Sequence, residues 1–150
     1  MHHLAQLNIA RLNHPLDAPQ SAEFVAALEP INAIAESTPG FVWRLKDESG
    51  ASSSYVPLEG NDDPLLIVNY SVWTDLDSLR HFVLRSGHAS YLRRRREWFQ
   101  PSAEATTVCW WTPAGEIPPL EDAHRRLLHL RAQGPSPRGW PLTGPIDPPS

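Results

Sequence analysis

The sequence contains only one cysteine, Cys109, and only one lysine, Lys46. A single cysteine excludes an intramolecular disulfide framework and gives no zinc-ligand spacing, so we expect a reducing, cytoplasmic location. No charged segment precedes an apolar run near the N-terminus, and no apolar run approaches the roughly 18 residues of a membrane span. The sequence therefore predicts neither a standard secretion signal nor a membrane partner.

An excess of positive charge is also lacking. The 13 lysine and arginine residues are outnumbered by 17 aspartate and glutamate residues, which gives a net charge of −4. Because nucleic-acid-binding domains normally carry the opposite balance, we expect no nucleic-acid partner. With 41% hydrophobic and 20% charged residues among 150, the composition is that of one globular domain, which buries about two-thirds of its unfolded surface.

Hydrophobic periodicity and turn residues divide the chain into strands and helices. Pro30 should kink or split the first helix, and Ser86-Gly87 should interrupt the second. Thr74 or Asp75 is expected to cap the start of the second helix. The predicted strands cover residues 4–11, 41–46, 65–73 and 106–112, and the predicted helices cover residues 20–37, 76–99 and 120–132.

The order of these elements is β-α-β-β-α-β with an added C-terminal helix. It is typical of an α+β, ferredoxin-like fold, in which two helices cover one face of a four-stranded antiparallel sheet. The other face would be apolar and bare, and an apolar face of that size normally finds a partner. The pattern therefore predicts a homodimer packed sheet to sheet.

The C-terminal end differs from the rest of the chain, because its last 17 residues hold six prolines and three glycines. We therefore divide the chain into a domain over residues 1–133 and a proline-rich tail over residues 134–150, which is disordered or extended over the domain. Few apolar residues are present to anchor the tail. The segment beyond about Gly139 is accordingly predicted to be dispensable for folding.

The stretch "HASYLRRRREWF" (residues 88–99) holds four consecutive arginines. Projected on a helix at about 100° per residue, Arg95 joins an apolar stripe, whereas Arg93, Arg94 and Arg96 face solvent. The projection therefore predicts that the four arginines are not equivalent. The other members of the apolar stripe are His88, Tyr91, Leu92, Trp98 and Phe99.

An arginine that points inward needs a partner, because an unpaired buried charge is very costly. Arg95 could form a structural ion pair, for which Glu23, Glu29 and Asp77 are available. It could instead hold an anionic or carbonyl oxygen of a ligand. Both interpretations stay open at this point.

His88 is the second candidate in this stretch, and three roles are open to it. It could be a buried histidine bonded to the backbone, a general acid or base, or an axial haem ligand. Neither the pair His81–His88 nor the pair His124–His129 is accompanied by the further ligands that a metal site needs. The sequence therefore predicts no metal site.

Tryptophans and in-strand polar residues are the remaining unusual features. A buried indole needs an acceptor for its N–H, so the tryptophans suit either the core or the wall of a pocket for a flat ligand. The neighbours Trp110 and Trp111 must face opposite sides of their strand. Asn8, Asn69 and Ser71 lie within predicted strands, where they could bond to a ligand or to a backbone group.

Three segments carry a resemblance to a known family: "INAIAESTPGFVWRL", "SVWTDLDSLRHFVLRSGHASYLRRRREWF" and "WWTPAGEIPPLEDAHRRLLHLRAQGPSP". Over roughly residues 4–138, the chain resembles an uncharacterised family of the dimeric α+β barrel superfamily, which includes antibiotic-biosynthesis monooxygenases and haem-degrading monooxygenases. The resemblance implies a ferredoxin-like protomer that dimerises through its sheet and has a small-molecule pocket between sheet and helices. It does not confer a reaction, because this fold hosts several chemistries.

Our first functional hypothesis is a cofactor-independent, monooxygenase-like enzyme that oxidises or cyclises an aromatic or polyketide-like substrate in natural-product biosynthesis, with O₂ as a possible co-substrate. His88 would be the catalytic base and Arg95 would hold the substrate anion. No cofactor is expected. The candidate substrate-binding residues are Asn8, Trp43, Asn69, Trp73, His81, Tyr91, Trp98 and Trp111.

Two alternatives belong to other classes of protein. The chain could be a haem enzyme with His88 as the axial ligand. It could also be a ligand-binding or scaffold dimer without enzymatic activity, whose proline-rich tail engages a partner.

Overall fold

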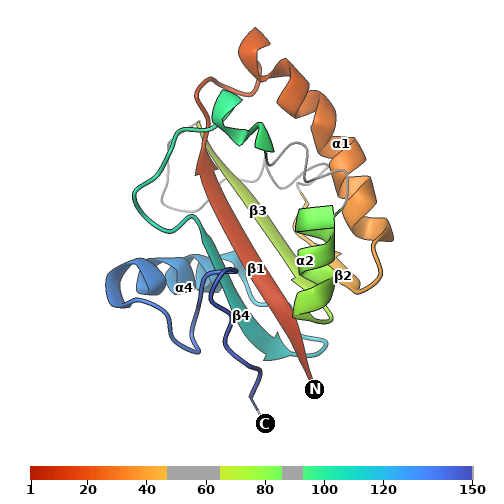
Figure 1. The fold of residues 1–150 in the computed structure, drawn as a ribbon, viewed down its shortest axis with the longest axis vertical. Helices are drawn as coiled ribbons and strands as arrows, with labels where there is room; N and C mark the ends of the chain where they lie inside the picture. Colours follow the sequence, from red (N-terminus) through yellow and green to blue (C-terminus); the bar gives the residue numbers. More distant parts are fainter. Residues whose placement is uncertain (47–64, 86–92, 150) are drawn as a thin grey trace.

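The computed structural model describes residues 1–46, 65–85 and 93–149. An antiparallel sheet with the strand order β2-β3-β1-β4 forms its centre (Figure 1). This order confirms the ferredoxin-like α+β fold. The strands are β1 (His2–Arg11), β2 (Phe41–Arg44), β3 (Leu66–Trp73) and β4 (Thr107–Pro113). The helices are α1 (Ala22–Ser37), α2 (Leu76–Arg85) and α4 (Leu120–Gln133), with short 3-10 turns η1 (Pro19–Ser21) and η3 (Arg95–Glu97).

The sheet has two differently covered faces, because successive side chains of a strand alternate between them. Leu4 of β1 packs in a cluster with residues of α1 and α2, whereas Ala5 and Leu7 pack in a second cluster with α4. We call these the α1/α2 face and the α4 face. Figure 1 shows α1 and α2 beside each other and α4 running across the strands.

The α4 face is apolar and nearly completely buried in the single chain. Ala123 and Leu127 of α4 are fully buried against it. The sheet residues of this face are between 0% and 4% exposed: Ala5, Leu7, Ile9, Val68, Tyr70, Val72, Val108 and Trp110. The expectation of a bare face is therefore wrong, because the amphipathic C-terminal helix packs on it. The predicted sheet-to-sheet dimer relied on that bare face, so the exposed apolar surface no longer supports it.

One end of the α1/α2 face is aromatic. Trp73 is 1% exposed and stacks on Phe82 of α2, with ring centroids 5.3 Å apart. Phe41 of β2 meets the same indole edge-on at 5.5 Å. Leu4 and Ala35 are buried in the same cluster. These contacts fix α1 and α2 against the sheet. The polar residues of the α1/α2 face lie toward its other end.

Pro30 does not split α1, which runs from Ala22 to Ser37. A proline inside a helix removes the bond to the carbonyl four residues earlier, here that of Ala26. Both residues are exposed, so water can satisfy the released carbonyl. Exposure therefore explains why the helix continues.

The junctions of β2, β3 and α2 are tight. Gly40 has φ +92° and accepts a hydrogen bond from Thr74 N at 2.7 Å. A Cβ at Gly40 would clash with Ser78 Oγ, so only glycine fits between α1 and α2. Asp75 Oδ1 accepts a hydrogen bond from Ser78 N at 2.7 Å, which confirms Asp75 as the cap of α2.

The tail is docked on the sheet through a tryptophan. Trp140 is fully buried and exchanges backbone hydrogen bonds of 2.8 and 2.9 Å with Cys109, on the free edge of β4. Trp111 Nε1 donates to Ile146 O at 2.7 Å. The expectation that the tail lacks an apolar anchor is wrong. Counting prolines misses Trp140, which enters the core, and Leu142 and Ile146, which pack against the same cluster.

Within the described ranges, no helix is long and apolar enough to cross a membrane.

Candidate functional site

The centre of the α1/α2 face carries polar side chains that bond to one another across three strands. Gln6 Nε2 donates to Asn69 Oδ1 and to Ser71 Oγ, each at 2.9 Å. Trp73 Nε1 also donates to Ser71 Oγ at 2.9 Å. Asn8 Nδ2 donates to Thr107 Oγ1 at 2.7 Å. We call Gln6, Asn8, Asn69, Ser71 and Thr107 the polar strip.

The polar strip contains hydrogen-bond donors that are not used within the strip. A hydroxyl oxygen has two lone pairs, and Ser71 Oγ uses both to accept from Gln6 and Trp73. With both lone pairs in use, the hydroxyl group of Ser71 has its proton left to donate to a further acceptor. Asn69 accepts through Oδ1, which leaves its Nδ2 protons available, and Asn69 is exposed. Two neutral donors thus lie two residues apart on one face of β3.

A pocket opens beside these donors, between β2, β3, α1 and α2. The pocket is narrow, with a cavity volume of about 20 Å³, which is room for about one water molecule. Because Asn69 is exposed, the polar end of the pocket is open to solvent. The lining residues are Ile31, Asn32, Ala35, Phe41, Arg44, Asn69, Tyr70, Ser71, Trp73 and Phe82.

Arg44 is the one charged residue among the described residues that line this pocket. It is the register partner of Ser71 on the neighbouring strand, and its side chain is only 12% exposed. Arg44 Nη2 lies 3.3 Å from Glu36 Oε1 on α1. The arginine that lines the candidate pocket is therefore Arg44. The sequence analysis had assigned the anion-binding role to Arg95 instead.

Three of the predicted substrate-binding residues, Asn8, Asn69 and Trp73, lie together on the α1/α2 face. Trp111 lies on the same face at β4, where its indole N–H is committed to the tail. Trp43 was expected in the site, but its ring packs edge-on against Tyr70 in the cluster of the α4 face.

His81 and Trp98 also lie outside the pocket lining. His81 is exposed on α2. Trp98 is 4% exposed and packs against Phe24, with ring centroids 5.7 Å apart. These contacts give Trp98 a role in attaching the segment after residue 92 to α1.

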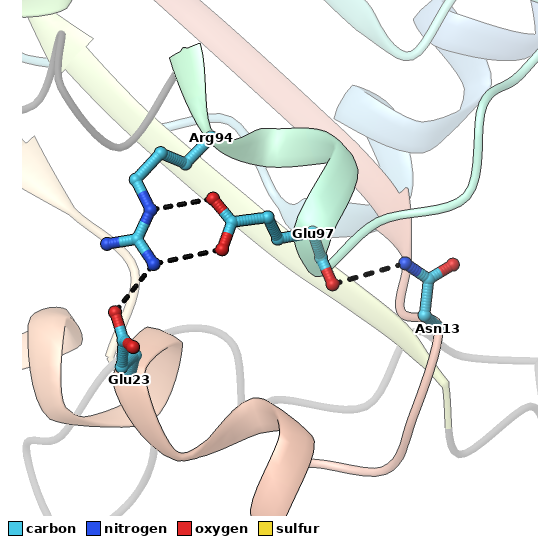
Figure 2. Close-up of polar contacts among 4 residues, drawn as sticks. All are labelled: Asn13, Glu23, Arg94 and Glu97. Atoms are coloured by element: carbon cyan, nitrogen blue, oxygen red, sulfur yellow. Dashed lines mark hydrogen bonds and ion pairs between the residues drawn. The ribbon is translucent and has the colours of Figure 1, made fainter.

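The helical projection of the four arginines is wrong. Arg95 is exposed, whereas Arg94 is half-buried and pairs with Glu97 at 2.7 Å and with Glu23 of α1 at 2.6 Å (Figure 2). The guanidinium of Arg94 also lies over the ring of Trp98, 4.9 Å from its centroid. The α-helical projection fails because residues 95–97 form a 3-10 turn with a different angular step.

The ion pairs of Arg94 are structural and lie at the surface, since both carboxylate partners are exposed. Glu97 and then Glu23 raise the pKa of Arg94 above its usual range, and Arg94 lowers the pKa of Glu97. Asn13 Nδ2 adds a bond to the carbonyl oxygen of Glu97 at 3.4 Å (Figure 2). Glu23, foreseen as a partner of Arg95, is thus the partner of Arg94.

His88 and Tyr91 fall outside the described residues. The roles of His88 as a catalytic base or an axial haem ligand therefore stay predictions. In the described ranges, no three histidine, cysteine, aspartate or glutamate side chains gather in a way that could hold a metal ion.

Two buried titratable groups near the sheet are unsuited to proton transfer. Burial raises the pKa of Cys109 to about 12, so its thiol stays protonated at neutral pH. Burial also raises the pKa of Tyr70 well above its usual range, and its hydroxyl donates to Pro118 O at 2.7 Å. Neither group can act as a base at neutral pH.

A second depression is larger than this pocket, but two of its charged side chains are already paired with each other. Its volume is about 470 Å³, and it lies where β4 connects to α4. Of its three charged residues, Asp122 and Arg126 pair with each other at 3.1 Å, and Glu116 is exposed. The other lining residues are Trp111, Thr112, Pro113, Ile117, Pro118 and Pro119. We therefore place the candidate site at the polar strip.

Sequence reasoning missed Gln6, Arg44 and Thr107, and it noted Ser71 without assigning it to the site. A signal for two of these positions was present. Gln6 and Asn8 are two residues apart in β1, as are Asn69 and Ser71 in β3, so each pair shares one face of its strand. Two polar residues that are two positions apart in an otherwise apolar strand indicate polar side chains gathered on one face of the sheet.

The fold and the polar strip define an α+β protein with a ferredoxin-like sheet and a candidate pocket between sheet and helices. The chain belongs to the family described as Domain of unknown function (DUF3291), which matches residues 3–150. None of the curated protein sequences compared with this chain matches it.

Solved structures share the fold at low sequence identity. SnoaB, a cofactor-independent oxygenase from Streptomyces nogalater, has 19% identity and a TM-score of 0.50, over 79% of this chain and 99% of that one. A Nitrosomonas europaea protein of unknown function has 12% identity and a TM-score of 0.51, over 79% and 97%. A Streptomyces coelicolor monooxygenase in complex with nanaomycin D has 18% identity and a TM-score of 0.45, over 79% and 93%. At these identities the likeness shows the fold alone.

Proposed function

We propose that the protein is a cofactor-independent oxygenase whose substrate is an aromatic molecule with an ionisable phenol or enol. The observation that carries the proposal is the pair of donors, Ser71 Oγ–H and Asn69 Nδ2–H, beside the Arg44 guanidinium in a pocket with aromatic walls. Such donors stabilise an oxyanion, and the low exposure of Ser71 and Arg44 strengthens the interaction. The fold shared with SnoaB is consistent with this reaction class.

The proposed chemistry needs a substrate anion and no bound redox group. The substrate anion gives one electron to O₂, which forms a carbon-centred radical and superoxide. These two recombine to a peroxide anion, which takes up a proton and loses water. In total, a CH₂ group and O₂ become a carbonyl group and water. The protein's contribution is to lower the pKa of the substrate and to hold its oxygen in place.

The aromatic end of the pocket would orient the substrate ring. Phe41 and Phe82 each pack tightly against Trp73, so a ligand ring cannot lie between either of them and Trp73. It would instead rest on the side of this cluster and extend toward exposed Asn69. Because the pocket is narrow, ring entry requires it to widen, which favours a planar substrate.

Oxygen uptake tests the proposal. A hydroxyanthrone is mixed with chelator-treated protein whose spectrum shows no Soret band, and O₂ consumption is recorded against the spontaneous rate. We expect Asn69→Ala to lower kcat by about 10- to 100-fold with an unchanged Tm, since it removes one exposed oxyanion donor. Gln133→Ala, an exposed amide at the end of α4, is the control. Wild-type uptake no faster than the spontaneous rate would refute the proposal.

A homodimer is a separate part of the proposal. It rests on the resemblance to the dimeric superfamily, because the α4 face is already covered within one chain. Multi-angle light scattering at micromolar concentration should give twice the mass of the chain. The mass of a single chain would contradict the dimer and leave the site unaffected.

A further inference from the structure

Gln6 lies at the centre of the polar strip, on β1 between β3 and β4. It is half-buried and is the register partner of Ser71. Its Nε2 donates to Asn69 Oδ1 and to Ser71 Oγ, each at 2.9 Å. A side-chain amide nitrogen carries two protons, so these two bonds use both of them. One side chain thus contacts both residues that we propose as donors to the substrate oxygen.

The two bonds determine which groups of Ser71 and Asn69 are left for a ligand. Ser71 Oγ also accepts from Trp73 Nε1, an indole N–H that can only donate. The hydroxyl proton of Ser71 is therefore the group that remains. Asn69 is bound through Oδ1, so its Nδ2 protons remain, and the residue is exposed. Because Gln6 donates, the strip offers a ligand an O–H and an N–H rather than acceptors.

A side chain at position 6 that only accepts would reverse this polarity. A glutamate has the same length as Gln6, but its carboxylate has no proton to donate. It would accept the hydroxyl proton of Ser71 and one N–H of Asn69, the two groups that the substrate oxygen needs. Its negative charge would also repel an oxyanion, which raises the pKa of a bound phenol. The polarity of the strip therefore depends on the amide nitrogen of Gln6.

From this network we infer that Gln6 makes the site select the ionised form of the substrate over the neutral phenol or enol. Gln6 is a positioning residue, because it acts through Ser71 and Asn69 and not on the reacting oxygen. The inference deepens the proposed function and rests on its assignment of these two donors. The selection matters for the proposed reaction, since the substrate anion is the form that gives an electron to O₂.

The test measures the ionisation of a bound phenol, so that no turnover is needed. A coloured nitronaphthol is titrated by absorbance with saturating wild-type protein, Gln6→Glu or Gln6→Met. We expect the wild type to lower the pKa of the naphthol and Gln6→Glu to return it to the free value or above. Gln6→Met removes the two bonds without supplying an acceptor, so it should keep about half of the wild-type shift.

Binding of two ligands separates this role from a structural one. One pKa unit is about a tenfold change in an equilibrium constant, so Gln6→Glu should weaken binding of the naphtholate by about 10- to 100-fold. The methyl ether of the same naphthol carries no charge, and its binding should change by less than about 3-fold. Gln133→Glu adds the same charge at an exposed position at the end of α4, and this control should match the wild type.

Gln6→Met keeps the inference falsifiable if Gln6→Glu does not fold, because methionine introduces no buried charge. An unchanged naphthol pKa in Gln6→Met would overturn the inference. Equal pKa changes in Gln6→Met and Gln6→Glu would also overturn it, since Gln6 would then act through packing alone. If the wild type lowers the pKa and Gln6→Glu lowers it equally, only the role of Gln6 fails. If the wild type itself leaves the pKa unchanged, the oxyanion site of the proposed function fails as well.

Discussion

Trp73 Nε1 donates to Ser71 Oγ at 2.9 Å, between two side chains on the same face of β3. The indole N–H is therefore occupied, and Trp73 is a positioning residue for Ser71 rather than a donor to the substrate. With the bond from Gln6, it fills both lone pairs of the hydroxyl oxygen and sets the direction of its proton.

The first prediction concerns this bond. Trp73→Phe keeps an aromatic ring beside Phe82 but removes the donor to Ser71. We expect kcat to fall by about 10-fold while KM changes by less than about 2-fold, since the oxyanion donor is present but no longer held. Steady-state O₂ uptake gives both constants. A variant that raises KM and leaves kcat intact would show that Trp73 acts as a wall of the pocket only.

The second prediction concerns the tail. Ending the chain after Arg138 removes Trp140, which is fully buried, and the bonds of the tail to β4. Loss of a buried tryptophan costs about 3–5 kcal/mol, so Tm should fall by more than about 6 °C. A chain that ends after Ile146 keeps these contacts and is the control. If both chains melt with the full-length protein, the tail is dispensable after all.

The third prediction separates two adjacent arginines. Arg94→Ala should lower Tm by about 1–3 °C, whereas Arg95→Ala should leave it within about 1 °C, because only Arg94 has carboxylate partners among the described residues. The difference should shrink at about 1 M salt, where exposed ion pairs are screened. Thermal melts at low and high salt check both points, and a larger effect of Arg95→Ala would contradict them.

These results show what local pattern can and cannot reveal. Alternating residues and turn signals predicted the strands, because the period of two follows directly from backbone geometry. The helical projection of residues 88–99 failed because it assumed one uninterrupted α-helix. Trp140 was missed because composition does not show where one side chain packs. Arg44 was missed because its place beside Ser71 depends on the register of two strands.

The fourth prediction is a pH dependence at the start of α2. The backbone N–H of Ser78 lowers the pKa of Asp75 in the folded state. A depressed folded pKa means that the stabilisation is complete above the unfolded pKa, near 4, and is lost as pH falls through the lower folded value. Asp75→Ala should thus cost about 1 kcal/mol at pH 7 and progressively less below about pH 4.

Urea unfolding of Asp75→Ala across this pH range checks the fourth prediction. Asp17→Ala, at an exposed position of the loop before η1, is the matched control and should show no such trend. A cost for Asp75→Ala that stays constant down to about pH 2 would mean that the charge of Asp75 is not what caps α2.

The most direct test of the central claim is the ionisation of a phenol bound at the polar strip. A coloured nitronaphthol is titrated by absorbance in the presence of saturating protein. If Ser71, Asn69 and Arg44 hold the oxyanion, the pKa of the bound phenol should lie about 1–2 units below that of the free phenol, and Asn69→Ala should reverse part of the shift. A bound phenol whose pKa equals or exceeds the free value would contradict the account, because the pocket would then prefer the neutral form.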